Sequence, residues 1–470
     1  MGTRQVITCL GLCLCLLVGG WASAQTVRVD SVVVTGLKKT KRATVTRQMV
    51  FQEGDTIDLA RLEELNKVNK SNIYNMGIFT SVEIANEIGD SSVEVHVDVQ
   101  ERWYIWPTPY VNLNERTLNE WLAHPDLDRL VYGLGVEWHN FTGWNDKLVL
   151  YAQGGYTQAL TGTYNRPFLF PKAKVDGIWQ ATYLNDKEIG YGTENGYLQL
   201  IRDEDRRMRK SYGAMFTLGK RFSARKIFYG FAAYQYFRLN PSVRDSNPDY
   251  LPYGLTSIHY PSVGVSYVND QRDIRSFPLS GYKYGALVRY FGVPGWSKTN
   301  FAKVALSFSH HIPLTKRWNF AYGSQQFMLV GDHIPYFDKY FVGFGSFLRG
   351  YEPHVIDGSF VNLTKAEWKF GIIPYHFAHL KWVPFAKFRD LPMGLYLSAY
   401  CDAGYVHDWT FSNNDRTLKD KLLLGYGGGV NFITIYDFLL RVEYSRNIVR
   451  DSYHPWGRGG IYFSTLVSIQ

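Results

Sequence analysis

The chain has few cysteines, and most of them lie at its N-terminus. Among 470 residues there are four, of which Cys9, Cys13 and Cys15 fall within the first 24 and only Cys401 lies beyond them. If the N-terminal segment is removed, no disulfide can form within the chain. A lone cysteine commonly packs as a small apolar side chain, so we expect packing rather than reactivity from Cys401.

Long apolar runs are also missing beyond the N-terminus. After residue 24 no uninterrupted apolar stretch reaches the roughly 20 residues that a transmembrane helix needs. The other structure that crosses a bilayer is a barrel of strands, because every backbone polar group must be paired in hydrocarbon. If the mature chain lies in a membrane, it therefore crosses that membrane as strands.

The motifs of common enzymes and metal sites are absent as well. There is no Gly-x-Ser-x-Gly elbow, no P-loop and no His-Glu-x-x-His pair. His310 and His311 are adjacent, so on a strand they point to opposite faces and cannot hold one metal together. We therefore expect no enzyme, no cofactor and no metal, although a barrel enzyme with catalytic groups at its rim remains an open alternative. The net charge of +9 comes from scattered basic residues, so nucleic acid is not an expected partner.

The first 24 residues have the pattern of a secretory signal peptide. Arg4 supplies a positive start, the run from Val6 to Val18 is apolar, and Ala22-Ser23-Ala24 is a small-residue cleavage site. We expect residues 1–24 to be removed and Gln25 to begin the mature, exported chain.

Residues 25–101 are poor in aromatics and rich in Val, Lys and Glu. Their periodicity predicts a strand, two helices and two further strands, which is the order of a small α+β domain. We expect Asp58 to cap the second helix and Gly77 to end it. The expected elements are a strand over Val27–Val34, helices over Thr44–Val50 and Asp58–Met76, and strands over Val82–Ala85 and Val93–Val99.

From Trp103 onward, apolar and polar side chains alternate in successive segments. Leu397 and Cys401, for example, fall on the face opposite Ser398 and Asp402. In the same way Val442 and Tyr444 fall on the face opposite Glu443, which this alternation turns inward. Soluble sandwiches also alternate. Charged residues on the inward faces, and aromatics at the segment ends, instead favour a barrel with a lipid-facing exterior and a polar lumen. At roughly 20 to 25 residues per strand and connection, this part of the chain holds about 16 strands.

Three stretches carry a family resemblance, and the first lies in the N-terminal domain. An early Gly36, the run Asn75–Val82 containing Gly77 and Phe79, and the closing Val97–Glu101 resemble a POTRA domain. The mature chain as a whole resembles the BamA/TamA outer-membrane assembly superfamily. The resemblance implies a small α+β POTRA-like domain followed by an all-β transmembrane antiparallel barrel of about 16 strands. The expected divisions are a signal peptide at 1–24, the POTRA-like domain at 25–101 and the barrel at 102–470.

The second stretch resembles the mid-barrel hairpin signature of this superfamily. Asn269–Asp273 ends one strand in charged turn residues, and Phe277–Tyr282 opens the next with a Pro-Gly turn. The residues that match the signature are Asp270, Arg272, Asp273, Pro278 and Gly281.

The third stretch, Phe341–Tyr351, contains the tripeptide Arg349-Gly350-Tyr351. It resembles the Arg-Gly-aromatic tip that, in relatives, lies on a long extracellular loop folded back into the lumen. An inward guanidinium needs carboxylates to offset its desolvation. Glu367 and Asp402 stand where the family pattern puts acids, and strand alternation independently turns both inward; Gly404 leaves backbone room beside Asp402. A purely structural clamp, without a direct part in transport, remains an alternative.

The resemblance implies a component of the outer membrane of a Gram-negative bacterium that helps insert or translocate polypeptides. Its partners would be the lipid bilayer, unfolded or secreted client polypeptides and periplasmic chaperones. The barrel is expected to open to client strands between a first strand near Tyr104–Leu113 and a last strand near Ile461–Ile469. Two departures from the family pattern are the single POTRA-like domain and the non-aromatic end at Gln470. A dedicated secretion pore for one partner, and a passive surface-antigen barrel, remain alternatives.

Overall fold

The computed structural model describes residues 26–115, 121, 125–203, 206–223, 225–275, 277–379, 390–410, 417–433, 438–449 and 459–467. The expected signal peptide lies outside these residues. The chain divides into two compact units, one reaching Trp106 and including the turn Trp138–Lys147, the other formed by Pro107–Glu137 and the chain from Leu148 onward. Among the described helices, none is both long and apolar enough to span a membrane.

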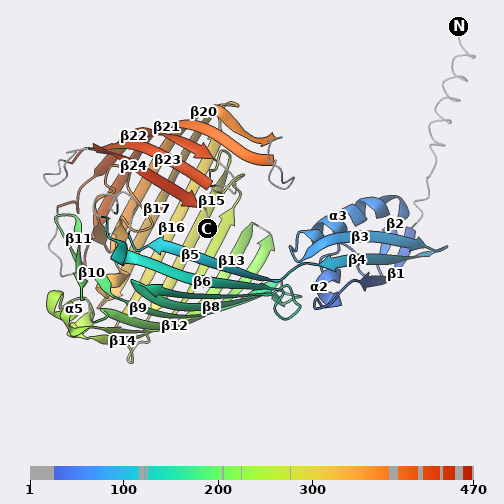
Figure 1. The fold of residues 1–470 in the computed structure, drawn as a ribbon, viewed down its shortest axis with the longest axis horizontal. Helices are drawn as coiled ribbons and strands as arrows, with labels where there is room; N and C mark the ends of the chain where they lie inside the picture. Colours follow the sequence, from blue (N-terminus) through green and yellow to red (C-terminus); the bar gives the residue numbers. More distant parts are fainter. Residues whose placement is uncertain are drawn as a thin grey trace, which may run out of the picture. The chain divides into compact units, whose positions relative to one another are not determined.

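The first unit contains a four-stranded sheet with two helices (Figure 1). Strand order is β2-β1-β4-β3, with β1 and β4 parallel and the other pairs antiparallel. Alternate valines of β1 and β4, such as Val29 and Val95, are fully buried and form the core with Ile73 and Phe79. The elements are β1 (Thr26–Thr35), α2 (Arg42–Thr46), β2 (Thr56–Asp58), η1 (Leu59–Arg61), α3 (Leu62–Tyr74), β3 (Phe79–Ile88) and β4 (Ser92–Glu101).

Both helices of this unit differ from the sequence prediction. The first covers Arg42–Thr46 and not Thr44–Val50, because the Val50 N–H donates to Asn69 Oδ1 at 2.8 Å and the chain turns to bury Met49. Asp58 caps the short 3-10 helix η1, accepting from the Ala60 N–H at 3.0 Å, and α3 begins only at Leu62. The three-residue strand β2 was not predicted, since three residues are too few to show alternation.

The turn Trp138–Lys147 folds as part of this first unit. Thr44 Oγ1 donates to the Gly143 carbonyl at 2.9 Å, and Asn140 Nδ2 donates to Thr40 Oγ1 at 2.7 Å. The Lys39 ammonium lies 4.7 Å from the centre of the Trp138 ring. These contacts fix the loop that follows Gly36.

The second unit is a 16-stranded antiparallel sheet, which confirms the predicted strand number. Neighbours in the sheet follow chain order, and β5 and β24 stand at its two ends. The strands are β5 (Ile105–Leu113), β6 (Leu130–His139), β7 (Lys147–Gly155), β8 (Thr157–Phe170), β9 (Val175–Asp186), β12 (Arg209–Ser223), β13 (Lys226–Leu239), β14 (Ser257–Asp270), β15 (Gly281–Phe291), β16 (Asn300–Pro313), β17 (Trp318–Asp332), β20 (Phe360–His379), β21 (Asp390–His407), β22 (Leu423–Ile433), β23 (Phe438–Asn447) and β24 (Gly459–Val467).

Connections between the strands differ in length at the two ends of the barrel. Residues 171–174 and 314–317 form short turns at one end, which we call the short-turn end. At the other, the long-loop end, the connections hold further elements (Figure 1). These are η2 (Leu127–Arg129), β10 (Glu188–Glu194), β11 (Tyr197–Arg202), α5 (Pro241–Ser246), η3 (Pro252–Gly254), η4 (Tyr336–Asp338), β18 (Tyr340–Val342) and β19 (Ile356–Gly358). Outer-membrane barrels carry their long loops on the extracellular side.

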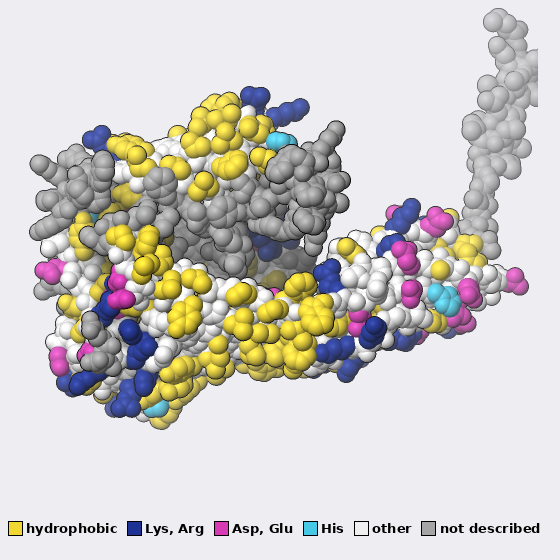
Figure 2. Space-filling model, viewed as in Figure 1, with side chains coloured by type: hydrophobic (Ala, Val, Ile, Leu, Met, Phe, Trp, Pro, Cys, Tyr) yellow, Lys and Arg dark blue, Asp and Glu magenta, His cyan; other side chains and the backbone are white. Residues whose placement is uncertain are grey.

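The inward and outward faces of the strands agree with the alternation in the sequence. Leu397 and Tyr444 are 43% and 53% exposed, whereas Asp402 and Glu443 on the opposite face are buried. Hydrophobic side chains gather on the outer surface of the barrel (Figure 2). Cys401 is exposed on this outer face, on the same side of the strand as Leu397, where the alternation in the sequence places it.

The lumen departs from a uniformly polar lining. Towards the long-loop end the inward residues Tyr260, Phe291, Phe301 and Leu329 are buried in an apolar core that also takes in loop residues such as Tyr336. Inward faces are polar where they meet water. Here they meet folded loops, so apolar side chains stabilise the packing.

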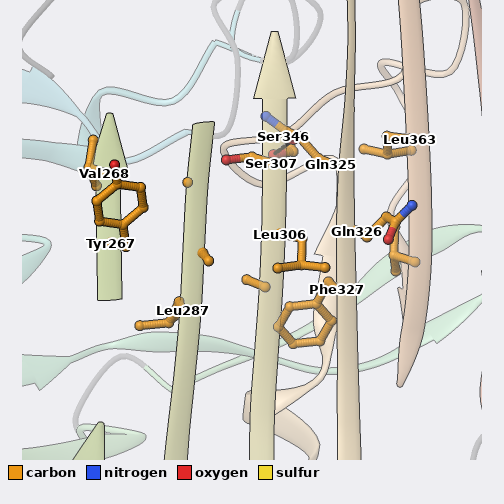
Figure 3. Close-up of a pocket in the computed structure, with 14 residues that line it drawn as sticks. Tyr267, Val268, Leu287, Leu306, Ser307, Gln325, Gln326, Phe327, Ser346 and Leu363 are labelled. Carbon is orange, nitrogen blue, oxygen red and sulfur yellow. Dashed lines mark hydrogen bonds between the residues drawn. The ribbon is translucent and has the colours of Figure 1, made fainter. Parts of the chain in front are cut away.

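One part of the lumen wall is hollowed (Figure 3). A cavity of about 270 Å³ lies beside Ser307, Gln325 and Phe327 of β16 and β17, and Ser346 of the β18–β19 loop borders it. Ser346 Oγ donates to Gln325 Oε1 at 3.0 Å. The small side chains of Gly285, Ala305 and Ser307 leave this space between neighbouring strands.

Leu306→Arg should destabilise the barrel, because Leu306 lies mid-strand on the outer face and is 47% exposed. An arginine facing lipid near the bilayer midplane costs roughly 2–4 kcal/mol. Ser307→Arg, on the next residue but beside the lumen cavity, should have a small effect. Unfolding of the two variants, followed by gel mobility in detergent with heating, measures the difference. Equal destabilisation by the two substitutions would contradict the assignment of faces.

Candidate functional site

The β18–β19 loop brings Arg349 into contact with the inner wall. Three glycines in this loop, Gly343, Gly345 and Gly350, have positive φ angles of 107°, 71° and 90°. Only glycine adopts such angles at little cost. At Gly350 a Cβ atom would also lie 2.9 Å from the Arg446 carbonyl oxygen. The bend at Gly350 therefore depends on the absence of a side chain.

The Arg349 guanidinium is held by a carboxylate fork. Its Nε donates to Asp402 Oδ2 at 2.8 Å and its Nη2 donates to Asp402 Oδ1 at 2.6 Å. Glu367 Oε2 lies 3.7 Å from Nη1. Arg349 is 7% exposed and Asp402 is fully buried. The structure thus brings together the arginine and both of the acids that the sequence singled out.

Two further residues of this site were missed by sequence reasoning. Glu443 on β23 places Oε1 3.5 Å from Arg349 Nη1, and it also lies 3.7 Å from Arg441 Nη1. Tyr400 on β21 lies beneath the guanidinium, with its ring centre 3.6 Å from the Arg349 Cζ. A cation over an aromatic ring gains further stabilisation when both are desolvated. Alternation had placed Glu443 inward, but nothing local in the sequence connects it to a residue 94 positions away.

Glycines of the wall make room for the loop. A Cβ at Gly404 would lie 2.9 Å from Leu348 Cδ2. Gly404 therefore leaves space for Leu348, the residue before Arg349. A Cβ at Gly425 on β22 would lie only 1.7 Å from the Arg349 carbonyl oxygen. Gly425 was not predicted, and it allows the loop backbone to lie directly against the wall.

The residues after Gly350 attach the loop to β23. Asn447 Nδ2 donates to the Gly350 carbonyl at 2.6 Å, and Ser445 Oγ donates to Glu352 Oε1 at 3.2 Å. Tyr351, which is 2% exposed, donates its hydroxyl to the Leu424 carbonyl at 3.4 Å. Burial raises the pKa of Glu352 to about 7, and the nearby Glu443 carboxylate acts in the same direction.

A second buried ion cluster lies among the long loops. Lys339 Nζ is 2.7 Å from Asp408 Oδ2, and Lys419 Nζ is 3.1 Å from Asp357 Oδ1. All four residues are buried or nearly so, and Thr193 of β10 donates to Asp357. The cluster joins three connections: those between β9 and β12, between β17 and β20, and between β21 and β22. Sequence reasoning did not find it, because its members come from separate loops.

The hairpin residues stabilise the β14–β15 turn. Arg272 donates through Nε and Nη2 to Asp270 at 2.8 Å each, and Asp273 accepts from the backbone N–H of Leu279 at 3.1 Å. The Pro278 carbonyl accepts from Lys369 Nζ at 3.2 Å. Gly281 has a φ of 95° and lies against the Gln271 carbonyl. These residues do not contact Arg349.

The POTRA-like residues are structural in their contacts. Gly36 has a φ of 80°, and a Cβ there would lie 1.8 Å from the Val99 carbonyl oxygen. Gly77 has a φ of 75° in the turn after α3, which ends at Tyr74, and Phe79 is fully buried. Among the described residues, one group has metal-ligand atoms within 4.8 Å of one another: Glu87, Glu94 and His96 on the exposed face of β3 and β4.

The free edge of β5 is short of hydrogen-bond donors. The His139 N–H donates to the Tyr104 carbonyl at 2.8 Å and the Asn114 N–H donates to the Arg129 carbonyl at 2.9 Å, so even-numbered residues of this segment face β6. Successive residues of a strand direct their backbone groups to opposite edges. The odd-numbered residues therefore face the free edge, and two of them, Pro107 and Pro109, have no N–H.

Comparison with known proteins gives matches over both units. Residues 140–465 match the family described as the Omp85 superfamily domain, and residues 27–102 match the POTRA family described as surface antigen variable number repeat. No curated protein matches the chain significantly in sequence.

Solved structures also resemble the chain. The crystal structure of BamA from Haemophilus ducreyi lacking POTRA domains 1-3 has a TM-score of 0.66 at 16% identity, covering 94% of this chain and 85% of that one. This likeness shows a shared fold. CdiB from Acinetobacter baumannii has a TM-score of 0.49 at 13% identity, covering 94% of this chain and 74% of that one. CdiB from Escherichia coli has a TM-score of 0.47 at 11% identity, covering 95% and 91%.

Arg349→Ala should destabilise the second unit by roughly 3–5 kcal/mol, because it removes the guanidinium that is hydrogen-bonded to both oxygens of the fully buried Asp402. Arg349→Lys should restore little of this loss, since an ammonium cannot bond both oxygens of Asp402 in a planar fork. Combining Arg349→Ala with Asp402→Asn should give clearly less than the sum of the single effects. Thermal unfolding in detergent measures these changes. Arg244→Ala, at an exposed residue of α5, is the control and should change stability by less than about 0.5 kcal/mol.

The attachment of the loop should depend on pH through Glu352. Its folded-state pKa of about 7 lies above the ordinary value of 4.5, so its stabilising contribution is fully present below pH 4.5 and is lost as the pH rises through 7. Hydrogen exchange of residues 343–355 should therefore be slower at pH 5 than at pH 8, after correction for the intrinsic rate. Glu352→Gln should remove most of this difference. A difference that persists in Glu352→Gln would assign the effect to another group.

Proposed function

The chain belongs to the Omp85 superfamily, and from this premise we propose that it is an outer-membrane barrel that helps insert polypeptide strands into that membrane. In this proposal the barrel spans the outer membrane of a Gram-negative bacterium, and the POTRA domain lies in the periplasm. The long loops then face the cell surface. In this proposal the chain needs no cofactor, because backbone hydrogen bonds between the barrel and the client strand favour insertion.

The observation that carries the proposal is the pair of free strand edges. Within the part of the chain that the structure describes, β5 and β24 are the two ends of the sheet, and each has one neighbour. An unpaired backbone group in hydrocarbon costs several kcal/mol. A client strand that pairs with such an edge removes this cost, so the edge favours formation of a strand at the membrane.

Pro107 and Pro109 adjust the strength of this edge. A proline removes one donor, so β5 presents fewer unsatisfied groups when the seam between β5 and β24 is open. For the same reason β24 gains fewer hydrogen bonds when it pairs with β5. Both effects shift the balance towards an open seam that a client strand can enter.

The Arg349 site supports the same function by holding the strands next to the seam. Through Asp402, Glu443 and Asn447 the loop contacts β21 and β23, and β24 pairs with β23. Movement of the seam can then be confined to β24 and β5, while the wall behind them keeps its register. This is a positioning role for Arg349.

The rival function, a dedicated secretion pore, requires a conduit through the lumen. The buried cluster of Lys339, Asp357, Asp408 and Lys419 joins loops at the long-loop end, and Arg349 attaches the β18–β19 loop to the wall. Opening a conduit must break these buried ion pairs. We therefore favour insertion at the seam over passage through the lumen.

The proposal is tested with the purified full chain in liposomes and a urea-unfolded eight-stranded barrel protein as client. We expect the client to acquire protease resistance several-fold faster than in empty liposomes. Liposomes carrying a heat-inactivated sample are the control. A client rate equal to that control would count against insertion, and client released into the liposome interior would favour the secretion pore.

The double substitution Pro107→Val, Pro109→Val should strengthen the seam by restoring two donors. We expect a higher unfolding temperature in detergent and slower insertion of the client. Pro261→Val is the matched control, because Pro261 lies within β14, paired with Tyr234 and away from the seam. If Pro107→Val, Pro109→Val has the same unfolding temperature and the same rate of client insertion as this control, the free edge of β5 does not limit client insertion.

A further inference from the structure

We infer that the outer face of strands β8, β9, β12 and β13 is a specific binding site for a phosphate-bearing, acylated lipid. The site lies on the opposite side of the barrel wall from the lumen and away from β5 and β24 in the order of strands. The inference rests on the proposed function only for the membrane orientation. Figure 2 shows hydrophobic side chains gathered over β8, β9 and β12.

The apolar part of the site is a trench across these strands. Gly162, Ala181 and Ala214 are direct neighbours on β8, β9 and β12, and they form a row of small outward residues. A hollow of about 680 Å³ lies over this row, and the outward side chains that line it include those of Leu148, Ala232 and Tyr234. The hollow is open and shallow, and larger residues flank it on both sides.

Two rows of aromatic rings form the walls of the trench. On the side of the short-turn end, Tyr164, Trp179 and Phe216 are cross-strand neighbours, with ring centres 5.5 and 5.0 Å apart. On the side of the long-loop end, Tyr183, Tyr212 and Tyr236 form the second row, with ring centres 5.2 and 6.4 Å apart. Tyrosines at this level are typical of the boundary between hydrocarbon and headgroups.

Two cations stand directly beyond the tyrosine row. Lys210 and Arg238 are exposed, face outward and are direct cross-strand partners on β12 and β13. Like charges in this arrangement destabilise a sheet. In the described part of the chain neither residue has a hydrogen-bonded or ion-paired acid. An anion bound between them would remove the repulsion.

A further polar group faces the same level. Asn185 on β9 is the cross-strand partner of Lys210 and is 7% exposed. Its Nδ2 donates to Gln158 Oε1 at 2.9 Å, while its Oδ1 has no hydrogen-bond partner in the described structure. This oxygen is buried, so it is an unused acceptor beside Lys210 and not a group on the surface.

The spacing of these parts fits one amphipathic molecule. Lys210, Tyr212, Ala214 and Phe216 follow one another on the same face of β12, so the cations lie about 14 Å from the trench along the strand at 3.4 Å per residue. A phosphate between Lys210 and Arg238 therefore places an acyl chain of the same lipid past the tyrosines and into the trench. The cations are at the long-loop end, so the lipid belongs to the surface leaflet of the membrane.

The test uses the purified full chain in detergent with diphosphorylated lipid A as the probe, and native mass spectrometry measures binding. Lys210→Gln, Arg238→Gln should weaken binding roughly tenfold or more, as expected when two cations beside an anionic lipid are lost. Ala214→Phe, which fills the trench, should also weaken it. The matched controls are Arg244→Gln, Lys298→Gln, with the same change of charge at the long-loop end, and Val288→Phe on the outer face of β15. Both controls should bind as the wild type does.

Three results would overturn the inference. An equal loss of lipid A binding in Lys210→Gln, Arg238→Gln and in the control Arg244→Gln, Lys298→Gln would show that only the net charge of the protein matters. Equal binding of lipid A by Ala214→Phe and Val288→Phe would show that the trench does not bind the acyl chain. Unchanged binding of lipid A after removal of its phosphates would show that Lys210 and Arg238 do not bind the anion. Because no client is present, these outcomes are independent of whether the chain inserts polypeptides.

Discussion

The burial of one guanidinium constrains the part of the barrel wall formed by β20, β21 and β23. Arg349 has left water almost completely, and an unpaired charge in such a place is very costly. Asp402 satisfies two of its donors in a fork, while Glu367 and Glu443 approach a third. These acids come from β20, β21 and β23. One side chain from a loop therefore fixes the relative positions of strands that are far apart in the sequence.

The backbone around this interaction depends on glycines, because side chains at these positions would collide with the loop or the wall. Gly425 and Gly404 carry no side chain where the loop lies against the wall, and Gly350 takes a left-handed conformation where the chain turns back. Each substitution at these glycines would push the guanidinium away from its acids. Local backbone geometry and the buried charge thus stabilise each other. The loop is held by ionic contacts at Arg349 and by apolar contacts at Leu348 and Tyr351.

The parts of this site that could be predicted from the sequence are those that depend on local alternation. Because side chains alternate along a strand, Glu367 and Asp402 point inward regardless of the rest of the barrel. The family resemblance identified Arg349 as their partner. Glu443 was also turned inward by alternation, but its contact with Arg349 depends on the register of four successive strand pairs. The ion cluster of Lys339, Asp357, Asp408 and Lys419 depends on loop packing and has no periodic signal. The apolar residues Tyr260, Phe291 and Phe301 were unexpected inside a lumen, because the rule of a polar interior assumes water where this barrel places folded loops.

The strands on either side of the seam are stabilised very unequally. Behind β24, Glu443 and Asn447 of β23 hold Arg349 and Gly350 of the loop through a buried ion pair and an amide hydrogen bond. On the other side, β5 has lost two donors at its free edge to Pro107 and Pro109. In hydrocarbon, the cost of an open edge is set by the number of unpaired backbone groups. A barrel that is firmly held by Arg349 and donor-poor at β5 can therefore open at one place without losing its remaining register, and this asymmetry is the physical basis for an edge that accepts a foreign strand.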